Sequence, residues 1–189
     1  MSTSLFSIDL RQRLRWRIQQ QWPRSAIPSS LYPWLIDSGS LTGKLIKASN
    51  GHFRVEILRQ DIACPLAEES RKLGMKPRGQ ALIREVILLG LGAPWVFARS
   101  VIPLSTLTGR QKALRNLDNR PLGAFLFADP SMKRGPMEIA RVPPGCFGTG
   151  CIDLEDSNDY LWGRRSIFYL DHKPLLVNEI FLSTFKPLQ

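Results

Sequence analysis

The stretch from residue 162 to residue 182 reads WGRRSIFYLDHKPLLVNEIFL and has the pattern of two strands joined by a tight turn. Two mainly apolar runs, 162–170 and 175–182, flank the turn-forming residues 171–174. This order predicts a β-hairpin, because Asp and Pro favour turns whereas β-branched and aromatic residues favour strands.

Each of two predicted strands carries a charged residue on an otherwise apolar face. Glu179 lies on such a face in the second run of the hairpin, and Arg84 lies on one in the strand predicted over 81–89. A lone buried charge is costly unless something pairs with it. The two residues therefore predict either a buried Arg84–Glu179 pair or a small pocket for a flat, polar, anionic molecule.

Period-two alternation and turn signals define the remaining elements. Strands are predicted at 53–60, 81–89, 95–102, 137–142, 162–170 and 175–182. Helical segments are predicted near 29–35, after Ser40 and within 103–127, and 65–80 is predicted as a mobile loop or a short helix. This order indicates an α+β fold with a mainly antiparallel sheet of about six strands.

Length and charge set the broad class of protein. The chain has 189 residues, 43% of them hydrophobic, which suits one domain with a real core. We expect that domain over 25–189, preceded by a basic arm over 1–24 that has five arginines and one aspartate. The net charge of +10 favours an anionic partner, which could be nucleic acid, a membrane surface or a small polyanion.

Several classes of site and of protein are disfavoured. No uncharged apolar run reaches the roughly 20 residues that span a bilayer, and no secretory signal is present, so we expect a cytoplasmic protein without a membrane span. Three cysteines do not make a disulfide framework, and only two histidines are present, so we expect no metal site. The Gly-rich segment 145–150 lacks the strand-then-helix setting of a dinucleotide site, and the acidic segment 153–159 suits a solvated loop.

Five segments in the same order resemble the chorismate pyruvate-lyase family. They are 84–88 (REVIL), 99–107 (RSVIPLSTL), 121–123 (PLG), 162–166 (WGRRS) and 174–182 (PLLVNEIFL). The resemblance covers roughly residues 30–185. It implies an antiparallel sheet with two helical flaps over a buried pocket, and a cofactor-free lyase that converts chorismate to 4-hydroxybenzoate and pyruvate for ubiquinone or plastoquinone biosynthesis.

The resemblance also implies roles for four residues. Arg84 would bind the ring carboxylate, the backbone N–H groups of Leu41 and Leu122 would donate to the same carboxylate, and Glu179 would meet the ring hydroxyl. Glu179 either transfers a proton or only orients that hydroxyl. For the second carboxylate of chorismate the candidates are Arg99, Arg164 and Arg165, for which salt-bridge or surface roles are the alternative. We expect a monomer that binds chorismate and 4-hydroxybenzoate and no nucleic acid.

Two features depart from the family pattern. Residues 143–160 look like an insertion, which either covers the pocket or decorates an edge. Leu41 stands where another long apolar residue, such as methionine, is expected, a change that a backbone contact tolerates. Two other functions remain open: a non-catalytic module of related fold that senses small aromatic acids, and nucleic-acid binding by the basic arm.

Overall fold

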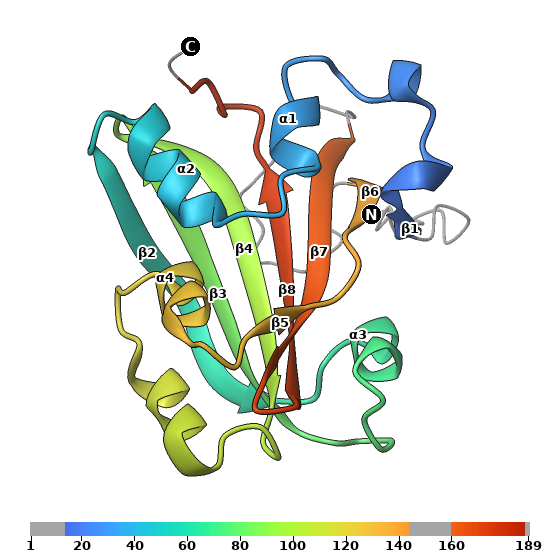
Figure 1. Cartoon of the computed structure of the whole chain (residues 1–189), viewed down its shortest axis with the longest axis vertical. Helices are drawn as coiled ribbons and strands as arrows, with labels where there is room; N and C mark the ends of the chain where they lie inside the picture. The colour runs from blue at the N-terminus through green and yellow to red at the C-terminus, as the bar shows by residue number, and fades with distance from the viewer. Residues whose placement is uncertain (1–13, 144–159, 188–189) are drawn as a thin grey trace, which may run out of the picture.

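The core of the protein is one antiparallel sheet with the strand order β1-β6-β7-β8-β4-β3-β2, and β5 pairs with β7 (Figure 1). The computed structural model describes residues 14–143 and 160–187. The strands are β1 (Arg17–Ile18), β2 (Phe53–Ala63), β3 (Ala81–Gly90), β4 (Ala93–Pro103), β5 (Lys133–Arg134), β6 (Glu138–Val142), β7 (Leu161–Leu170) and β8 (Lys173–Phe181).

Short helices lie on both faces of this sheet. They are α1 (Tyr32–Leu35), α2 (Leu41–Ala48), α3 (Ala67–Lys72) and α4 (Leu122–Ala128), with 3-10 turns at Gln19–Gln21, Arg24–Ala26 and Gly109–Asn116. Figure 1 looks onto the face covered by α1, α2 and α4, which we call the front face. Helix α3 packs on the opposite, back face, where its two glutamates pair with Arg99 and Arg165 of the sheet.

Cover on both faces explains why the central strands are almost wholly apolar. All ten residues of β3 are buried, and in β4 every residue from Trp95 onward is buried. On the front face, α1 and α2 add Trp34, Leu35 and Leu45 to one apolar cluster, while α4 adds Leu126 to another. Burial of this kind contributes about 25 cal/mol per Å² of apolar surface, so these helices stabilise the sheet that they cover.

Tight turns set the register of the two long hairpins. The β3–β4 turn has positive φ at Leu91 (53°) and Gly92 (80°), and the β7–β8 turn has positive φ at Asp171 (48°) and His172 (64°). Positive φ at both central residues matches the right-handed twist of the flanking strands. Gly163 of β7 is required by packing, since a Cβ there would lie 2.5 Å from the Ile180 side chain.

The predicted fold class is confirmed. Each of the six predicted strands is present, and the described residues add two more, β1 and β5, each only two residues long. The helical prediction over 103–127 holds for Gly109–Asn116 and α4, whereas Pro103 ends β4 and residues 104–108 form an irregular turn. Of the two alternatives for 65–80, the short helix is correct, because α3 lies there.

The predicted basic arm is described only from residue 14. Within it, β1 pairs with β6, and Trp22 Nε1 donates a hydrogen bond to the carbonyl of Ile139 at 3.0 Å. The domain boundary at residue 24 stays a prediction. The predicted insertion at 143–160 lies almost wholly outside the described residues. Within the described ranges, no helix is both long enough and apolar enough to cross a membrane.

Candidate functional site

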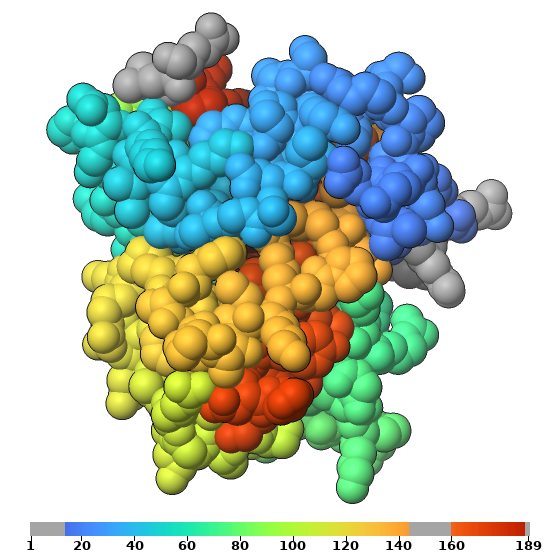
Figure 2. All heavy atoms as spheres, viewed as in Figure 1, coloured from blue at the N-terminus to red at the C-terminus, as the bar shows by residue number. Residues whose placement is uncertain are grey.

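A pocket of about 530 Å³, its open mouth included, lies between the front face of the sheet and helices α2 and α4. The sheet contributes Arg84, Val86, Ala98, Ser100, Val177 and Glu179 to its wall. The space-filling view shows that α2 and α4 meet over this part of the sheet and cover most of it (Figure 2). A ligand in the pocket would therefore be largely enclosed, as is typical of small-molecule sites.

Arg84 lies at one end of this pocket. It projects from β3 and is 1% exposed. Its Nη2 donates to the carbonyls of Asp118 (2.8 Å) and Arg120 (3.1 Å), whereas its Nε is buried without an acceptor in the described structure. Burial lowers the pKa of Arg84, because the charged form loses its hydration. The site therefore holds a buried cation with a free donor, which is what an anionic ligand requires.

Two helices begin beside this pocket. Leu41 is the first residue of α2 and Leu122 is the first residue of α4, and both line the pocket. The first N–H groups of a helix have no partner within it, so these backbone groups are free to donate to a ligand. The helix starts are close together, since a Cβ on Gly123 would lie 2.8 Å from Oγ1 of Thr42.

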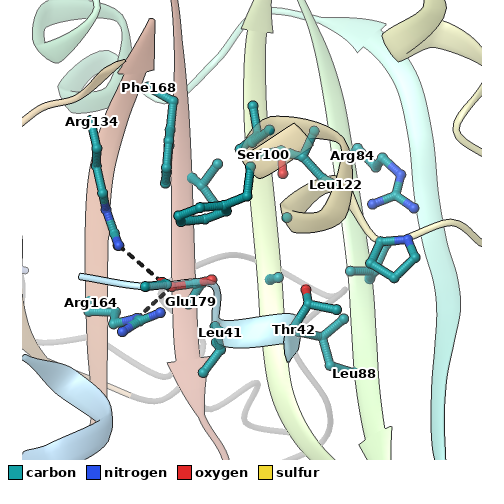
Figure 3. A pocket seen from close by; sticks show the side chains of 18 residues that line it. Leu41, Thr42, Arg84, Leu88, Ser100, Leu122, Arg134, Arg164, Phe168 and Glu179 are labelled. Carbon is teal, nitrogen blue, oxygen red and sulfur yellow. Dashed lines mark hydrogen bonds and ion pairs between the residues drawn. The ribbon is translucent and has the colours of Figure 1, made fainter. Parts of the chain in front are cut away.

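Glu179 lies at the other end of the pocket and pairs with Arg164, as Figure 3 shows. The two residues are direct neighbours across β7 and β8, and Arg164 Nε donates to Oε2 of Glu179 at 2.6 Å. Arg164 Nη1 also donates to the carbonyls of Trp34 (2.7 Å) and Asp37 (2.8 Å), in the segment that leads into α2. Through these hydrogen bonds, Arg164 links Glu179 to the segment that precedes α2, the helix over the pocket.

The alternative that Arg84 and Glu179 pair with each other is wrong. Arg84 is in register with Ser100 and Val177, so Glu179 is two strands and two residues away. Strand spacing and rise place the two Cα atoms roughly 12 Å apart. The space between them belongs to the pocket (Figure 3).

Arg134 is a pocket residue that the sequence analysis missed. It follows α4 on β5, and its Nε donates to Oγ of Ser166 at 3.0 Å. Burial, and then the charge of Arg164, lower the pKa of Arg134 to about 10. Strand β5 has only two residues, Lys133 and Arg134, so no alternation could have indicated which way this side chain points.

Two of the candidate arginines lie on the back face, away from the pocket. Arg99 donates to Glu69 of α3 at 2.8 Å and also pairs with Glu85, and Arg165 donates to Glu138 at 2.7 Å. Burial alone would lower the pKa of Arg99, but the hydrogen bonds to Glu69 and Glu85 outweigh it and raise the pKa. Arg99 and Arg165 therefore form salt bridges and do not face the pocket, where a second ligand carboxylate would bind.

The charges of the pocket suit a dianion. Among the described residues, three guanidinium groups (Arg84, Arg134 and Arg164) and one carboxylate (Glu179) line it, which gives these groups a formal charge of +2. Low dielectric strengthens each contact with a ligand charge. Across residues 14–143 and 160–187, no three His, Cys, Asp or Glu side chains form a group that could hold a metal ion.

Comparison with known sequences points to one family. The profile of the family described as "Chorismate lyase" matches residues 10–187 of the chain. A probable chorismate pyruvate-lyase of Psychromonas ingrahamii is 40% identical over 167 residues, covering 85% of this chain and 89% of that protein. Proteins with the same description are 39% identical in Marinobacter nauticus, covering 85% of each chain, and 38% identical in Aromatoleum aromaticum, covering 88% of this chain and 91% of that one.

Comparison with solved structures shows a shared fold. The effector domain of PhnF from Mycobacterium smegmatis superposes with a TM-score of 0.55 at 12% identity, covering 82% of this chain and 94% of that domain. A GntR-family transcriptional regulator from Bacillus cereus gives a TM-score of 0.52 at 13% identity, covering 73% of this chain and 96% of that one. At such low identity the likeness concerns the fold alone.

Proposed function

The chain belongs to the chorismate lyase family, and from that premise we propose that its pocket converts chorismate to 4-hydroxybenzoate and pyruvate. The proposal depends on the polar groups at the two ends of this pocket. Arg84 has a buried donor without an acceptor among the described residues at one end, and Glu179 pairs with Arg164 at the other. The product is a flat acid with a carboxylate and a hydroxyl at opposite ends of a ring, and so its shape and polarity match the pocket.

The ring carboxylate binds at the Arg84 end. Arg84 Nε donates one hydrogen bond, and the N–H groups of Leu41 and Leu122 add two more from the starts of α2 and α4. Charge-assisted hydrogen bonds of this kind are about twice as strong as neutral ones. Because backbone N–H groups supply part of the site, leucine at position 41 is as suitable as methionine.

The ring hydroxyl binds at the Glu179 end. Glu179 accepts the hydroxyl hydrogen bond, while Arg164 fixes the position of the carboxylate from the neighbouring strand. The ring then lies against Val86, Ala98 and Val177 of the sheet. This arrangement fixes the ring along its length, so that the ether carbon next to the hydroxyl-bearing carbon has one defined place.

The proposed reaction mainly requires that the protein hold the substrate in a reactive geometry. One ether C–O bond breaks, the hydroxyl-bearing carbon loses its hydrogen as a proton, and the departing enolpyruvate is protonated to pyruvate while the ring becomes aromatic. No electrons, water or further group are taken up, so the proposal includes no cofactor. Fixed geometry and prearranged charges of the kind described are recognised sources of rate acceleration.

A direct assay tests the proposed function. Purified protein in EDTA-containing, nucleotide-free buffer should release 4-hydroxybenzoate and pyruvate from chorismate in equal amounts, detected by ultraviolet absorbance and by a lactate dehydrogenase coupled assay. Tight binding of 4-hydroxybenzoate with no turnover of chorismate would instead support the sensing module, whose fold the effector domains share.

Oligomeric state, location and nucleic-acid binding are further parts of the proposal. We expect a monomer in the cytoplasm that supplies a quinone precursor and does not bind nucleic acid. Light scattering on the purified protein tests the first point, and cell fractionation tests the second. A DNA-binding titration at low salt with and without residues 1–24 tests the third.

A further inference from the structure

The buried and half-buried arginines of the sheet differ in one respect, which is whether a carboxylate neutralises them. Arg99, Arg164 and Arg165 each form an ion pair with a glutamate at 2.8 Å or less. In the described part of the chain, Arg84 and Arg134 form no such pair, and both line the pocket. A guanidinium that is removed from water without a counter-ion indicates a place for an external anion.

Among the described residues, Arg134 donates hydrogen bonds to neutral acceptors alone. Nε donates to Oγ of Ser166 (3.0 Å), Nη1 donates to the carbonyls of Ser38 (2.8 Å) and Gly39 (3.4 Å), and Nη2 reaches Sδ of Met137 at 3.3 Å. The guanidinium also lies 5.0 Å from the centre of the Phe168 ring. A thioether is a weak acceptor, so Nη2 can exchange this contact for a carboxylate at little cost.

Arg134 and Arg84 lie at opposite ends of the pocket. Figure 3 shows Arg134 on the side of Glu179 and Arg164, and Arg84 beyond Leu122 on the other side. Arg134 is close enough to Arg164 and Glu179 for their charges to act on its pKa. Arg164 already donates to Glu179 and to two backbone carbonyls, so among the described residues at this end Arg134 is the cation without a carboxylate partner.

Chorismate has a second carboxylate, and its chemistry places that group near Arg134. The enolpyruvyl ether is attached to the ring carbon next to the one that bears the hydroxyl. With the ring carboxylate at Arg84 and the hydroxyl at Glu179, the ether and its carboxylate must extend from the ring at the Glu179 end.

We propose that Arg134 binds the enolpyruvyl carboxylate and thereby distinguishes the dianionic substrate from the monoanionic product. This inference rests on the proposed function, and it assigns the role to Arg134 in place of Arg99 and Arg165. Because 4-hydroxybenzoate lacks the second carboxylate, Arg134 contributes to substrate binding and to holding the departing pyruvate, while Arg84 contributes to the binding of both ring compounds.

The test compares two ligands and several variants. Arg134→Gln should lower kcat/KM for chorismate by about 10- to 100-fold, the equivalent of one lost charge-assisted contact, while the Kd of 4-hydroxybenzoate changes by less than about threefold. Arg84→Gln should weaken both ligands, and Arg134→Lys should recover part of the chorismate activity because it keeps the charge. Arg54→Gln, on the exposed edge strand β2, removes the same charge outside the pocket and should change neither value.

A merely structural role for Arg134 gives a different result. Arg134 also contacts the Ser38 carbonyl, so if it only held this segment in place, Arg134→Gln would weaken chorismate and 4-hydroxybenzoate equally, and that outcome overturns the proposal. Retention of full kcat/KM in Arg134→Gln overturns it as well. Failure of the wild-type protein to act on chorismate would instead refute the proposed function itself.

A ligand comparison on the wild-type protein keeps the proposal testable if Arg134→Gln does not fold. A hydroxybenzoate that carries a carboxymethyl ether beside its hydroxyl should bind at least about 10-fold more tightly than the matching carboxamide, since only the first can pair with Arg134. Equal affinities would overturn the proposal. In Arg134→Lys the difference between the two ligands should persist but shrink.

Discussion

At the scale of single residues, Arg84 lowers the stability of the protein when the pocket is empty. Arg84 is fully buried, yet its Nε has no acceptor among the described residues. An unsatisfied buried donor costs about 1–3 kcal/mol, and more for a charged group. A ligand carboxylate would remove this cost, so the residue that destabilises the empty protein is the one that favours the bound state.

Replacing Arg84 by alanine should abolish measurable turnover, lowering kcat/KM by about 100-fold or more, and should weaken 4-hydroxybenzoate binding to a similar extent. The reason is the loss of the buried cation that Arg84 places at that end of the pocket. Steady-state kinetics and calorimetry measure the two effects, and circular dichroism verifies that the variant is folded. Near-normal kcat/KM in folded Arg84→Ala would show that the ring carboxylate binds elsewhere.

Replacing Glu179 by glutamine should separate its two possible roles. Glutamine keeps a hydrogen-bond acceptor at the same place, so a purely orienting role predicts a fall in kcat of about 10-fold or less, and this is the result we expect. A catalytic proton transfer typically contributes 10²- to 10⁴-fold, so a fall in kcat beyond about 100-fold would assign proton transfer to Glu179. The measurement is kcat at saturating chorismate, with 4-hydroxybenzoate affinity as the check on the pocket.

At the scale of elements, the two faces of the sheet differ in what they carry: the front face lines the pocket, and the back face carries ion pairs. Neighbouring residues of one strand point to opposite faces, so β4 presents Ala98 and Ser100 to the pocket and Arg99 to the ion pairs beneath α3. On β7, Arg164 faces the pocket and Arg165 faces the back. The front face therefore holds the proposed ligand, whereas the back face holds a buried network of charges.

The contact between α2 and α4 should control how fast the product leaves. Gly123→Ala places a Cβ 2.8 Å from Oγ1 of Thr42, which is too close, so the two helices must move apart. We expect 4-hydroxybenzoate to dissociate several-fold faster, measured by stopped-flow displacement. Adding Thr42→Ala removes the clashing oxygen and should restore slow dissociation, and a double variant as fast as Gly123→Ala would exclude this contact as the cause.

The ion pairs beneath α3 should govern stability rather than binding. Glu69 is fully buried, and both of its carboxylate oxygens accept hydrogen bonds from Arg99 on the back face of the sheet. Removing one partner of a buried pair costs about 3–5 kcal/mol, so Glu69→Ala should lower the free energy of unfolding by that amount. Urea unfolding measures it, and Glu56→Ala on the exposed side of β2 is the control. A loss below about 1 kcal/mol would mean that water or a rearranged side chain replaces Glu69.

At the scale of the whole molecule, the net charge acts together with the pocket. The chain carries a charge of +10, and the pocket adds its own excess of positive groups. A field of this sign raises the local concentration of anions, and its effect grows with the charge of the ligand. Chorismate, with two carboxylates, should gain more from it than 4-hydroxybenzoate.

Salt should therefore weaken chorismate capture more than product binding. Between about 20 and 500 mM sodium chloride, kcat/KM should fall by roughly three- to tenfold, because the screening length shrinks from about 20 Å to a few Å. The Kd of 4-hydroxybenzoate should change less over the same range. A kcat/KM that does not respond to salt would show that only the buried contacts of the pocket matter for capture.

Alternation along single strands, turn residues and a few ordered motifs were enough to predict the strands, the α+β class, the family, and the face on which Arg84 and Glu179 each lie. These features depend on residues adjacent in the chain, which is why local pattern was sufficient. Tertiary structure alone decided that Glu179 pairs with Arg164, that Arg99 and Arg165 face away from the pocket, and that Arg134 lines it. Strand order and register determine which side chains become neighbours, and they arise from packing between segments that are far apart in the sequence.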